Sequence, residues 1–533
     1  MIRLSAIAAI VLAWLVVGIA PGQAEDSFSL DRLRADRKEA AQRERRVIFN
    51  NDGNEPIYLC EDDTPQELLR HRTAPLADTH VDTIFYCTWS SGFGMFTHDT
   101  KEGHLFKTKE GLFSKNRIES MLAAGTDPLQ VMVDFGKRND IEIFWSFSMN
   151  DTHDAGQSGY GPIMLRANPL KLEHPDWLLG TPKKRPKFGG WSAVDYARPE
   201  IRDLTVAYVE EVCRNYDVNG IELDFFRHPV FFKRAAQTGT PCNEEERALM
   251  TEMLRRIRTV TEVEGQKRKK PILLTVRVPD SVEYCRDCGL DIENWLSEGW
   301  IDMMTVSGYY RLNPWETSVR LGAKYGVPVY PSLDESRVRD KDAKRARMTV
   351  EAYRGRALAA RQAGMAGLNL FNSFNPHAAI WRELGDTEAL AKSDHDYFAS
   401  IRGVGAAAGG ALPHRDYQNV ATLNPKAPLT ITSGKSQIVS FYAGVDYQKL
   451  KTDVAPEITL LLQFDGQPPS DTIVKLNGAT LKSSLAEEGS LACSVKPKQL
   501  KAGENRVVVS LPGKNASAKW TDLRCKVRFE PKQ

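Results

Sequence analysis

The chain has 533 residues, of which 71 are basic and 69 acidic, and 42% of its residues are hydrophobic. This length exceeds one ordinary domain and predicts a large α/β domain with a smaller one beside it. The near balance of charges excludes a polycation built to bind nucleic acid, and the hydrophobic content excludes a disordered chain. We therefore expect a folded protein with two hydrophobic cores.

The first 24 residues have the features of a secretory signal. Arg3 precedes an apolar run over residues 7–19, and the small residues 22–24 offer a cleavage point before Glu25. The run is too short for a typical membrane span, and no later stretch is long and apolar enough to cross a bilayer. We expect a secreted or periplasmic protein without an integral membrane segment after cleavage. A retained N-terminal anchor is the alternative.

All eight cysteines follow this signal, in the part of the chain where disulfides can form. Cys493 and Cys525 are the two cysteines of the C-terminal region, so they are the expected pair. Cys285 and Cys288 have the spacing of half a zinc site or of a redox motif, but no second half follows at a matching spacing. We interpret them as local structural residues.

A barrel is predicted between residues 46 and 402. Residues 25–45 are charged and helix-prone without an apolar period that demands a core, and we expect an N-terminal arm there. Apolar, β-rich runs then alternate with helical segments, which is the pattern of an α/β fold of the (β/α)8 TIM barrel type. The eight runs cover residues 47–50, 81–88, 141–148, 220–226, 272–278, 301–307, 327–333 and 366–371.

A second domain is predicted after the barrel. Residues 403–425 contain a run rich in glycine and alanine that lacks a core-forming period, which predicts a linker. Residues 426–533 contain short apolar runs separated by turn residues, which predicts an all-β sandwich of the jelly-roll type. The turn at residues 500–505 is similar to turns of jelly-roll modules fused to carbohydrate enzymes. A carbohydrate-binding domain and a packing domain without a ligand both stay open.

The ends of the predicted strands supply the candidate site residues, because catalytic groups of such barrels gather at the C-terminal ends of the strands. Here they form a polar and aromatic rim, which suits a sugar: hydroxyls pair with amides and carboxylates, and ring faces pack on aromatic side chains. A long connection over residues 150–198 adds a tryptophan. The predicted substrate-binding residues are Trp89, Asn150, Asp151, His153, Trp191, Arg227, His228, Arg277, Tyr309, Tyr310, Asp334 and Asn372.

Two acids on the fourth predicted strand are the strongest catalytic candidates. Glu222 and Asp224 alternate with apolar residues and therefore point into the barrel. Glycoside hydrolysis needs two carboxyl groups, and Asp224 is the first choice because it ends the strand. Glu222 lies two residues deeper, so we expect it to pair with Arg277 or to act directly. Glu335, after the seventh strand, is preferred to Asp334 as the second carboxylate; alternatively it lies in a solvated turn and caps the next helix.

Other chemistries have weaker signals. Residues 150–154, Asn-Asp-Thr-His-Asp, offer oxygen ligands and one histidine, but their spacing matches no specific metal-binding loop. Sugar binding or turn stabilisation is the preferred interpretation, and we expect no cofactor and no metal. The sequence contains no Gly-rich phosphate loop and no Gly-x-Ser-x-Gly elbow, which argues against nucleotide and esterase chemistry.

Several motifs in the first domain resemble the glycosyl hydrolase-like family 10. They are Phe-Trp-Ser at 144–146, Asn-Asp at 150–151, Pro-Glu-Ile-Arg at 199–202 and Tyr-Asp-Val-Asn-Gly-Ile-Glu-Leu-Asp at 216–224. The resemblance covers about residues 45–400 and implies a (β/α)8 barrel that acts on carbohydrate, with Asp224 as the matching acid of the fourth strand. That family usually has a second acid directly after this Asp, where this chain has Phe225.

Two further patterns set limits. The α-amylase superfamily pattern at this strand matches Gly220, Asp224 and His228, but Glu222 replaces its arginine. A chitinase pattern would place its catalytic glutamate at Phe226. We therefore predict an exported glycoside hydrolase of another type that cleaves a poly- or oligosaccharide with a pair of carboxylates. The alternatives are a carbohydrate-binding barrel without catalysis and a structural envelope protein. The pattern leaves the sugar, the linkage and the oligomeric state open.

Overall fold

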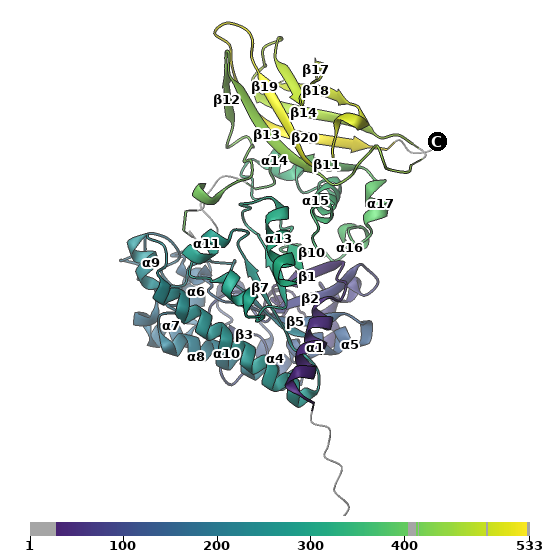
Figure 1. Cartoon of the computed structure of the whole chain (residues 1–533). Helices are drawn as coiled ribbons and strands as arrows, with labels where there is room; N and C mark the ends of the chain where they lie inside the picture. The colour runs from purple at the N-terminus through teal and green to yellow at the C-terminus, as the bar shows by residue number, and fades with distance from the viewer. Residues whose placement is uncertain (1–27, 403–411, 414, 453, 487–488, 530–533) are drawn as a thin grey trace, which may run out of the picture.

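The computed structural model describes residues 28–402, 412–413, 415–452, 454–486 and 489–529 (Figure 1). The predicted signal lies outside these residues, as does most of the first half of the predicted linker. Within the described ranges, no helix combines the length and apolar character needed to cross a membrane. Figure 1 shows two parts, a barrel with its surrounding helices and an all-β domain above it.

The first part is a barrel of eight parallel strands in the order β10-β1-β2-β5-β6-β7-β8-β9. A parallel bridge between Ser332 and Asn369, with a 2.7 Å hydrogen bond from Leu333 N to Asn369 O, joins the two end strands and closes the barrel. The predicted (β/α)8 fold is confirmed. Its strands are β1 (Val47–Asn51), β2 (Val81–Cys87), β5 (Glu142–Ser148), β6 (Gly220–Asp224), β7 (Leu273–Val278), β8 (Met303–Val306), β9 (Val329–Pro331) and β10 (Leu368–Leu370).

Helices fill the connections between these strands. The predicted capping box is present, since the Asn243 side chain accepts from Glu246 N and the Glu246 carboxylate accepts from Asn243 N, both at 2.9 Å. The longer helices are α5 (Pro128–Asn139), α8 (Pro199–Asn215), α10 (Glu244–Arg268), α13 (Trp315–Tyr325) and α15 (Val350–Gln362). The shorter ones are α2 (Glu55–Tyr58), α3 (Pro65–Arg70), α4 (Ile118–Ala123), α6 (Gly161–Arg166), α7 (Pro169–Glu173), α9 (Lys233–Thr238), α11 (Val282–Asp287), α12 (Ile292–Ser297), α14 (Lys341–Ala346), α16 (Ile380–Glu383) and α17 (Thr387–Ala391).

The segment predicted as an N-terminal arm is part of the barrel. It forms helix α1 (Leu30–Ala41), which packs on α10 and buries Leu33 and Ala41. Arg45, fully buried after the helix, pairs with Glu142 at the start of β5 at 2.6 Å. The high charge of this segment concealed its packing, because its buried cations have acidic partners elsewhere in the chain.

The interior of the barrel is layered, because residues two apart on a strand point to the same side. The lowest layer is an apolar cluster that contains Ile48, Phe85, Phe144, Leu273, Met303 and Tyr330. Two residues further along the strands the inward positions become mostly polar, and two residues beyond those Asp52, Asp224, Arg277 and Asp334 place charge at the C-terminal mouth. The inward series on β6 is Gly220, Glu222 and Asp224. At the N-terminal end of the barrel, the ion pair of Arg45 and Glu142 is also buried.

The second part is a pair of antiparallel sheets. One has the order β11-β20-β14-β18-β17, with β12 also paired to β20, and the other has the order β13-β19-β15-β16. The predicted all-β domain is confirmed. Its strands are β11 (His395–Phe398), β12 (Leu429–Thr432), β13 (Ser436–Ala443), β14 (Glu457–Asp465), β15 (Ile473–Leu476), β16 (Ala479–Thr480), β17 (Ser483–Leu485), β18 (Ser490–Val495), β19 (Gly503–Ser510) and β20 (Ser517–Arg528); a small separate sheet pairs β3 (Met95–Phe96) with β4 (His104–Leu105).

The boundary between the two parts differs from the predicted one at residue 402. Strand β11 lies before that residue and pairs antiparallel with β20, from His395 against Val527 to Phe398 against Arg524. All four of its residues are buried, so it lacks the alternation that marks a half-exposed strand. The all-β domain packs on α15 through β11 and β13, and Arg347 pairs with Asp522 at 2.6 Å across the boundary.

The expected disulfide between Cys493 and Cys525 is wrong for this fold. Strand β14 lies between the two cysteines, and its Leu460 is paired with Cys493 on one side and with Cys525 on the other. Strands lie ~4.8 Å apart, so the two Cα atoms are about 10 Å apart, beyond the ~7 Å that a disulfide spans. All eight cysteines are free thiols and buried.

This arrangement predicts the outcome of peptide mapping. When the folded protein is alkylated under denaturing conditions without reduction and then digested, we expect Cys493 and Cys525 in separate, alkylated peptides. Recovery of one peptide pair cross-linked through these two residues would contradict the strand order of this sheet.

Candidate active site

Strand β6 places Asp224 at the mouth of the barrel. Gly220 begins the strand, and a Cβ atom there would lie 2.2 Å from the Phe144 ring, so glycine permits the close packing of β6 on its neighbour. Asp224 Oδ1 accepts hydrogen bonds from the backbone N–H groups of Phe226 (2.9 Å) and Arg227 (3.1 Å). Oδ2 accepts from Arg277 Nη1 at 3.0 Å. Three donors thus hold Asp224 as a fixed carboxylate.

Asp224 is the centre of an alternating row of acids and arginines across the mouth. Arg227 lies between Asp52, at 2.5 Å, and Asp224 Oδ2, 3.9 Å from its Nε. Arg277 lies between Asp224, at 3.0 Å, and Asp334 Oδ2, 3.8 Å from its Nη2. We call these five residues the ion-pair row. It runs from the end of β1 to the end of β9 and compensates each buried charge with an opposite one.

Aromatic rings cover the ion-pair row. The Arg277 guanidinium lies 3.7 Å from the ring centre of Phe371, 5.6 Å from that of Phe226 and 5.8 Å from that of Tyr309. Such cation–π contacts hold the guanidinium in place. Asp224 is only 2% exposed. A ligand therefore reaches it only when side chains at the mouth move aside.

Glu222 does not pair with Arg277, contrary to expectation, because Arg277 is engaged by Asp224 and Asp334. Instead Glu222 Oε2 accepts from Ser146 Oγ at 2.5 Å and from Asn50 Nδ2 at 3.4 Å. Its Oε1 has no hydrogen-bond partner among the described residues. Burial, and next the charge of Asp224, raise the pKa of Glu222 to about 8. Burial therefore favours the protonated form of Glu222.

This pKa predicts a pH dependence of stability. Below the usual glutamate value of 4.5, Glu222 is protonated in the folded and the unfolded chain. Between 4.5 and about 8 the unfolded chain releases the proton while the folded chain keeps it, so stability falls as the pH rises. We expect the free energy of unfolding, measured relative to Glu222→Gln, to decrease across this window. A difference that stays constant over the same pH range would contradict a protonated Glu222.

The structure does not bring Glu335 into the mouth. Its side chain is 28% exposed at the rim, where it pairs with Lys344 at 3.0 Å and with Arg337 at 3.6 Å. Asp334 takes the inward position instead: it is fully buried, and its Oδ1 accepts from Ser332 Oγ at 2.6 Å. The preference for Glu335 over Asp334 as the acid facing Asp224 was therefore wrong.

A second polar cluster lies beside the ion-pair row. Asp151 accepts from Gly92 N at 2.9 Å, and its Oδ2 lies 2.5 Å from His153 Nδ1 and 3.5 Å from His228 Nδ1. The Asp151 charge raises the pKa of His153, whose side chain is 31% exposed. His153 is thus a solvent-accessible histidine oriented by a buried carboxylate, at the position predicted to contact a sugar.

Other predicted site residues have structural roles in this state. Asn150 donates to Val194 O and Val230 O and accepts from Val194 N, so it fastens the long connection after β5. Trp89 stacks on Phe106 with ring centres 4.3 Å apart, and Trp191 donates to Ala155 O. Tyr310 packs in the cluster of Phe226 and Tyr284, and Asn372 takes a left-handed backbone conformation after Phe371.

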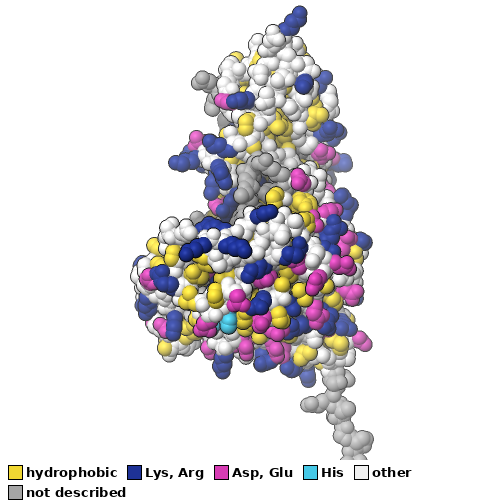
Figure 2. All heavy atoms as spheres, turned by 90° about the vertical axis from the view of Figure 1, so that its left-hand side faces the viewer, with side chains coloured by type: hydrophobic (Ala, Val, Ile, Leu, Met, Phe, Trp, Pro, Cys, Tyr) yellow, Lys and Arg dark blue, Asp and Glu magenta, His cyan; other side chains and the backbone are white. Residues whose placement is uncertain are grey.

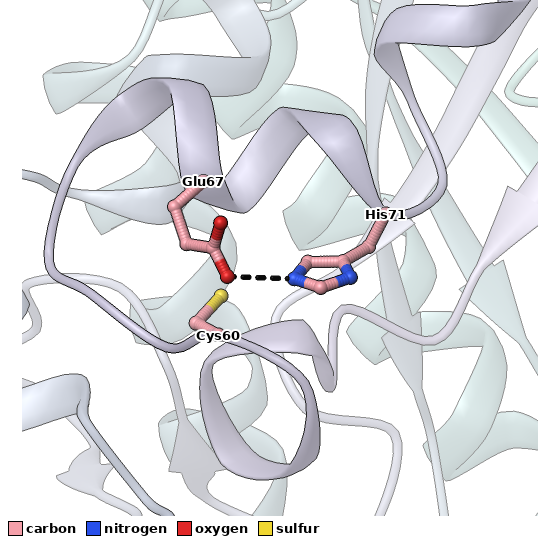
Figure 3. A group of neighbouring side chains, drawn as sticks. All are labelled: Cys60, Glu67 and His71. Carbon is pink, nitrogen blue, oxygen red and sulfur yellow. Dashed lines mark hydrogen bonds and ion pairs between the residues drawn. The ribbon is translucent and has the colours of Figure 1, made fainter.

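Among the residues that the structure describes, two groups of side chains have the composition of a metal site. In Cys60, Glu67 and His71 (Figure 3), the Glu67 carboxylate points at both the thiol and the imidazole. The Glu67 oxygens already accept from Arg70, from Glu61 N and from His71, and burial raises the pKa of Cys60 to about 12. A neutral thiol and a carboxylate neutralised by arginine fit a structural cluster better than a cation site.

The second such group is Asp151, His153 and His228. His228 Nδ1 accepts from Thr152 N at 3.2 Å, and Asp151 is occupied by backbone and histidine donors. A cation would have to displace these hydrogen bonds. The expectation of a site without metal stays a prediction.

The comparisons with known proteins agree with the sequence motifs. Residues 58–318 match the model of the family described as glycosyl hydrolase-like 10. This match supports the predicted resemblance to that family. The match spans the strands β2 to β8 and includes Asp224 and Arg277, whereas Asp52 and Asp334 lie outside it. No curated protein matches the chain.

Solved structures similar to this chain include several carbohydrate enzymes. The GH36 α-galactosidase of Geobacillus stearothermophilus is 11% identical, with a TM-score of 0.37, 94% of this chain and 59% of that chain covered. The cycloisomaltooligosaccharide glucanotransferase of Paenibacillus sp. is 11% identical (TM-score 0.35; 91% and 57% covered). An α-amylase of Anoxybacillus is 11% identical (TM-score 0.36; 89% and 99% covered). The chain thus spans less than two thirds of the first two proteins.

Proposed function

We propose that this protein is a glycoside hydrolase that cleaves a poly- or oligosaccharide at the mouth of its barrel. The observation that carries the proposal is the pair of acids on β6. Asp224 is held by three donors, two backbone N–H groups and Arg277, while burial and the neighbouring charge raise the pKa of Glu222 to about 8. Two neighbouring carboxyl groups in different protonation states are what glycoside hydrolysis requires. The match of residues 58–318 to a glycosyl hydrolase-like family model supports the same chemistry.

In this proposal Asp224 is the ionised group that stabilises the positive charge developing on the sugar, or attacks it. Glu222 is the acid that supplies the proton required by the leaving oxygen. Its Oε1, which has no hydrogen-bond partner among the described residues, is the atom that releases this proton. Arg277 positions Asp224 through their ion pair. His153, the accessible member of the neighbouring cluster, binds a sugar hydroxyl.

A second candidate function is carbohydrate binding without cleavage. The observation that favours it is the burial of Asp224, Glu222 and Asp334, all fixed in ion pairs or hydrogen bonds. In that case the rim residues would hold a sugar above a structural ion-pair row. The two candidates differ in whether product forms.

The experiment that tests the proposal is a screen of α- and β-linked polysaccharides for newly formed reducing ends. We expect release from at least one polymer. Binding to a polymer, measured by co-sedimentation, without any release of reducing ends would support the second candidate instead.

We also propose that the protein acts outside the cytoplasm and that the β-sandwich assists in sugar binding. The first proposal rests on the signal-like residues 1–24 and the second on the jelly-roll-like turn before β19. Cell fractionation with an antibody tests the first. Expression of a chain ending before residue 395, if it folds, tests the second by its affinity for the polymer.

A further inference from the structure

A cavity of about 80 Å³ lies where the β-sandwich meets the barrel. The ends of β8 and β9, helix α15, strand β11 and residues 418–422 form its walls. Figure 2 shows Lys and Arg side chains on both sides of the boundary between the two parts. Three arginines line the cavity itself: Arg311, Arg356 and Arg402.

Two of these arginines, Arg311 and Arg356, are short of acceptors. Arg311 lies against Trp315, 4.1 Å from its ring centre, and its Nε donates to Asn313 O. Arg356 donates to Asp334 O at 2.8 Å. Among the described residues, Arg311 Nη2 and Arg356 Nη1 are buried without a hydrogen-bond partner. Burial lowers the pKa of both groups, and the acids that oppose this shift, Asp280 and Glu316 for Arg311 and Asp334 for Arg356, do not reverse it.

The acids near the cavity do not balance this charge. Asp396 lines the cavity, but it is paired with Arg524 and Arg528 of β20. Arg402 lies 3.6 Å from Asp334, which already faces Arg277. Uncompensated buried cations are costly, so the cavity favours an anion.

The walls of the cavity favour an organic anion over a bare inorganic one. Trp315, Tyr442 and Phe398 contribute aromatic surface, and Leu333, Val420 and Ala421 contribute aliphatic surface. A planar guanidinium binds a carboxylate through two parallel hydrogen bonds, and aromatic faces pack on a sugar ring. We propose that this cavity binds the carboxylate group of an acidic sugar.

The cavity is linked to the ion-pair row by direct contacts. Arg402 faces Asp334 Oδ1, Asp334 Oδ2 faces Arg277, and Arg277 donates to Asp224. An acidic sugar unit bound to Arg402 is therefore connected to Asp224 through two side chains, Asp334 and Arg277. This step rests on the proposed function and narrows its substrate to a glycan that contains uronic acid units.

The test is equilibrium binding by titration calorimetry on the full chain, with trigalacturonate and the neutral trimer maltotriose as probes. We expect trigalacturonate to bind at least about tenfold more tightly, since each charge-assisted contact contributes on that scale. Arg311→Gln and Arg356→Gln should each weaken trigalacturonate binding by about tenfold. Arg320→Gln, which changes an exposed arginine of helix α13 that does not line the cavity, is the control and should change the affinity less than about twofold.

Arg356→Lys is the control that distinguishes a loss of binding from a loss of folding in the glutamine variants. It keeps the charge and loses the planar fork, so we expect intermediate affinity with an unchanged melting temperature. Equal binding of the two trimers, or trigalacturonate binding unaffected by the Arg311 and Arg356 variants, would overturn the proposal. Tighter binding of sulfate than of trigalacturonate would overturn it in favour of an inorganic anion. Calorimetry needs no turnover, so binding should persist in Asp224→Asn, and a failure here is distinguishable from a failure of the hydrolase proposal.

Discussion

Replacing Asp224 by Asn is expected to lower kcat/KM for a polysaccharide substrate by about 10³-fold or more. The substitution removes the negative charge of the carboxylate while the side chain keeps nearly the same shape. The amide cannot stabilise a developing positive charge as a carboxylate does. The measurement is the initial rate of reducing-end release at saturating and limiting substrate, with the far-ultraviolet circular dichroism spectrum checked for each variant.

Glu335→Gln is the matched control for this variant. Glu335 lies four residues from the end of β9, at the exposed rim, and is paired with Lys344 and Arg337 outside the ion-pair row. We expect its kcat/KM within about threefold of the unmodified chain, which is ordinary for a rim charge. A well-folded Asp224→Asn variant with unchanged activity, or a Glu335→Gln variant as inactive as Asp224→Asn, would remove Asp224 from its assigned role.

Replacing Arg277 by Met is expected to destabilise the folded chain by about 3–5 kcal/mol, the usual cost of removing one partner of a buried ion pair. Arg277 is fully buried, and its loss leaves Asp224 and Asp334 facing each other with reduced compensation. Urea unfolding followed by tryptophan fluorescence measures the change. Adding Asp224→Asn to this variant should recover part of the lost stability, because it removes one of the two uncompensated carboxylates.

The control for this stability effect is Arg320→Gln, which removes an exposed arginine from α13. Its effect on the free energy of unfolding is expected to stay below about 0.5 kcal/mol. An Arg277→Met variant as stable as this control would mean that the ion-pair row contributes little to the fold, and that Asp224 does not depend on Arg277.

The eight barrel strands and most strands of the second domain could be predicted from the sequence, because they have a clear apolar pattern and are bounded by turn residues. The short, exposed strands β16 and β17 lack such a pattern. Strand β11 could not be predicted, since all four of its residues are buried and its partner β20 lies more than a hundred residues later. The disulfide prediction failed for a related reason. Cys493 and Cys525 are the two cysteines of that region, but pairing of strands distant in sequence placed β14 between them.

The inward-facing residues of the candidate site follow from the two-residue alternation of side chains along each strand. Continuing the inward series Tyr330, Ser332 beyond β9 gives Asp334, and Glu335 falls on the outward side. The same alternation from Ile48 through Asn50 gives Asp52, which lies in the ion-pair row.

The partner of Arg277 could not be predicted from one sequence. Glu222, Asp224 and Asp334 all lie within reach of the same mouth, and only packing decides between them. Ser146 and Asn50, on neighbouring strands, donate hydrogen bonds to Glu222. Arg277 pairs with the other two acids, Asp224 and Asp334. Burial and the charge of Asp224 raise the pKa of Glu222, and the depth of burial could not be predicted from spacing along β6.

Cleavage in water enriched in oxygen-18 tests the central claim most directly. The protein is incubated with the polysaccharide that gives reducing ends in the screen, and the products are examined by mass spectrometry. Hydrolysis of a glycosidic bond adds one water molecule for each cut, so every new reducing end should carry one oxygen-18 atom and no unsaturated sugar should form. Products without the label, unsaturated products, or binding without any product would contradict a hydrolase built on Asp224 and Glu222.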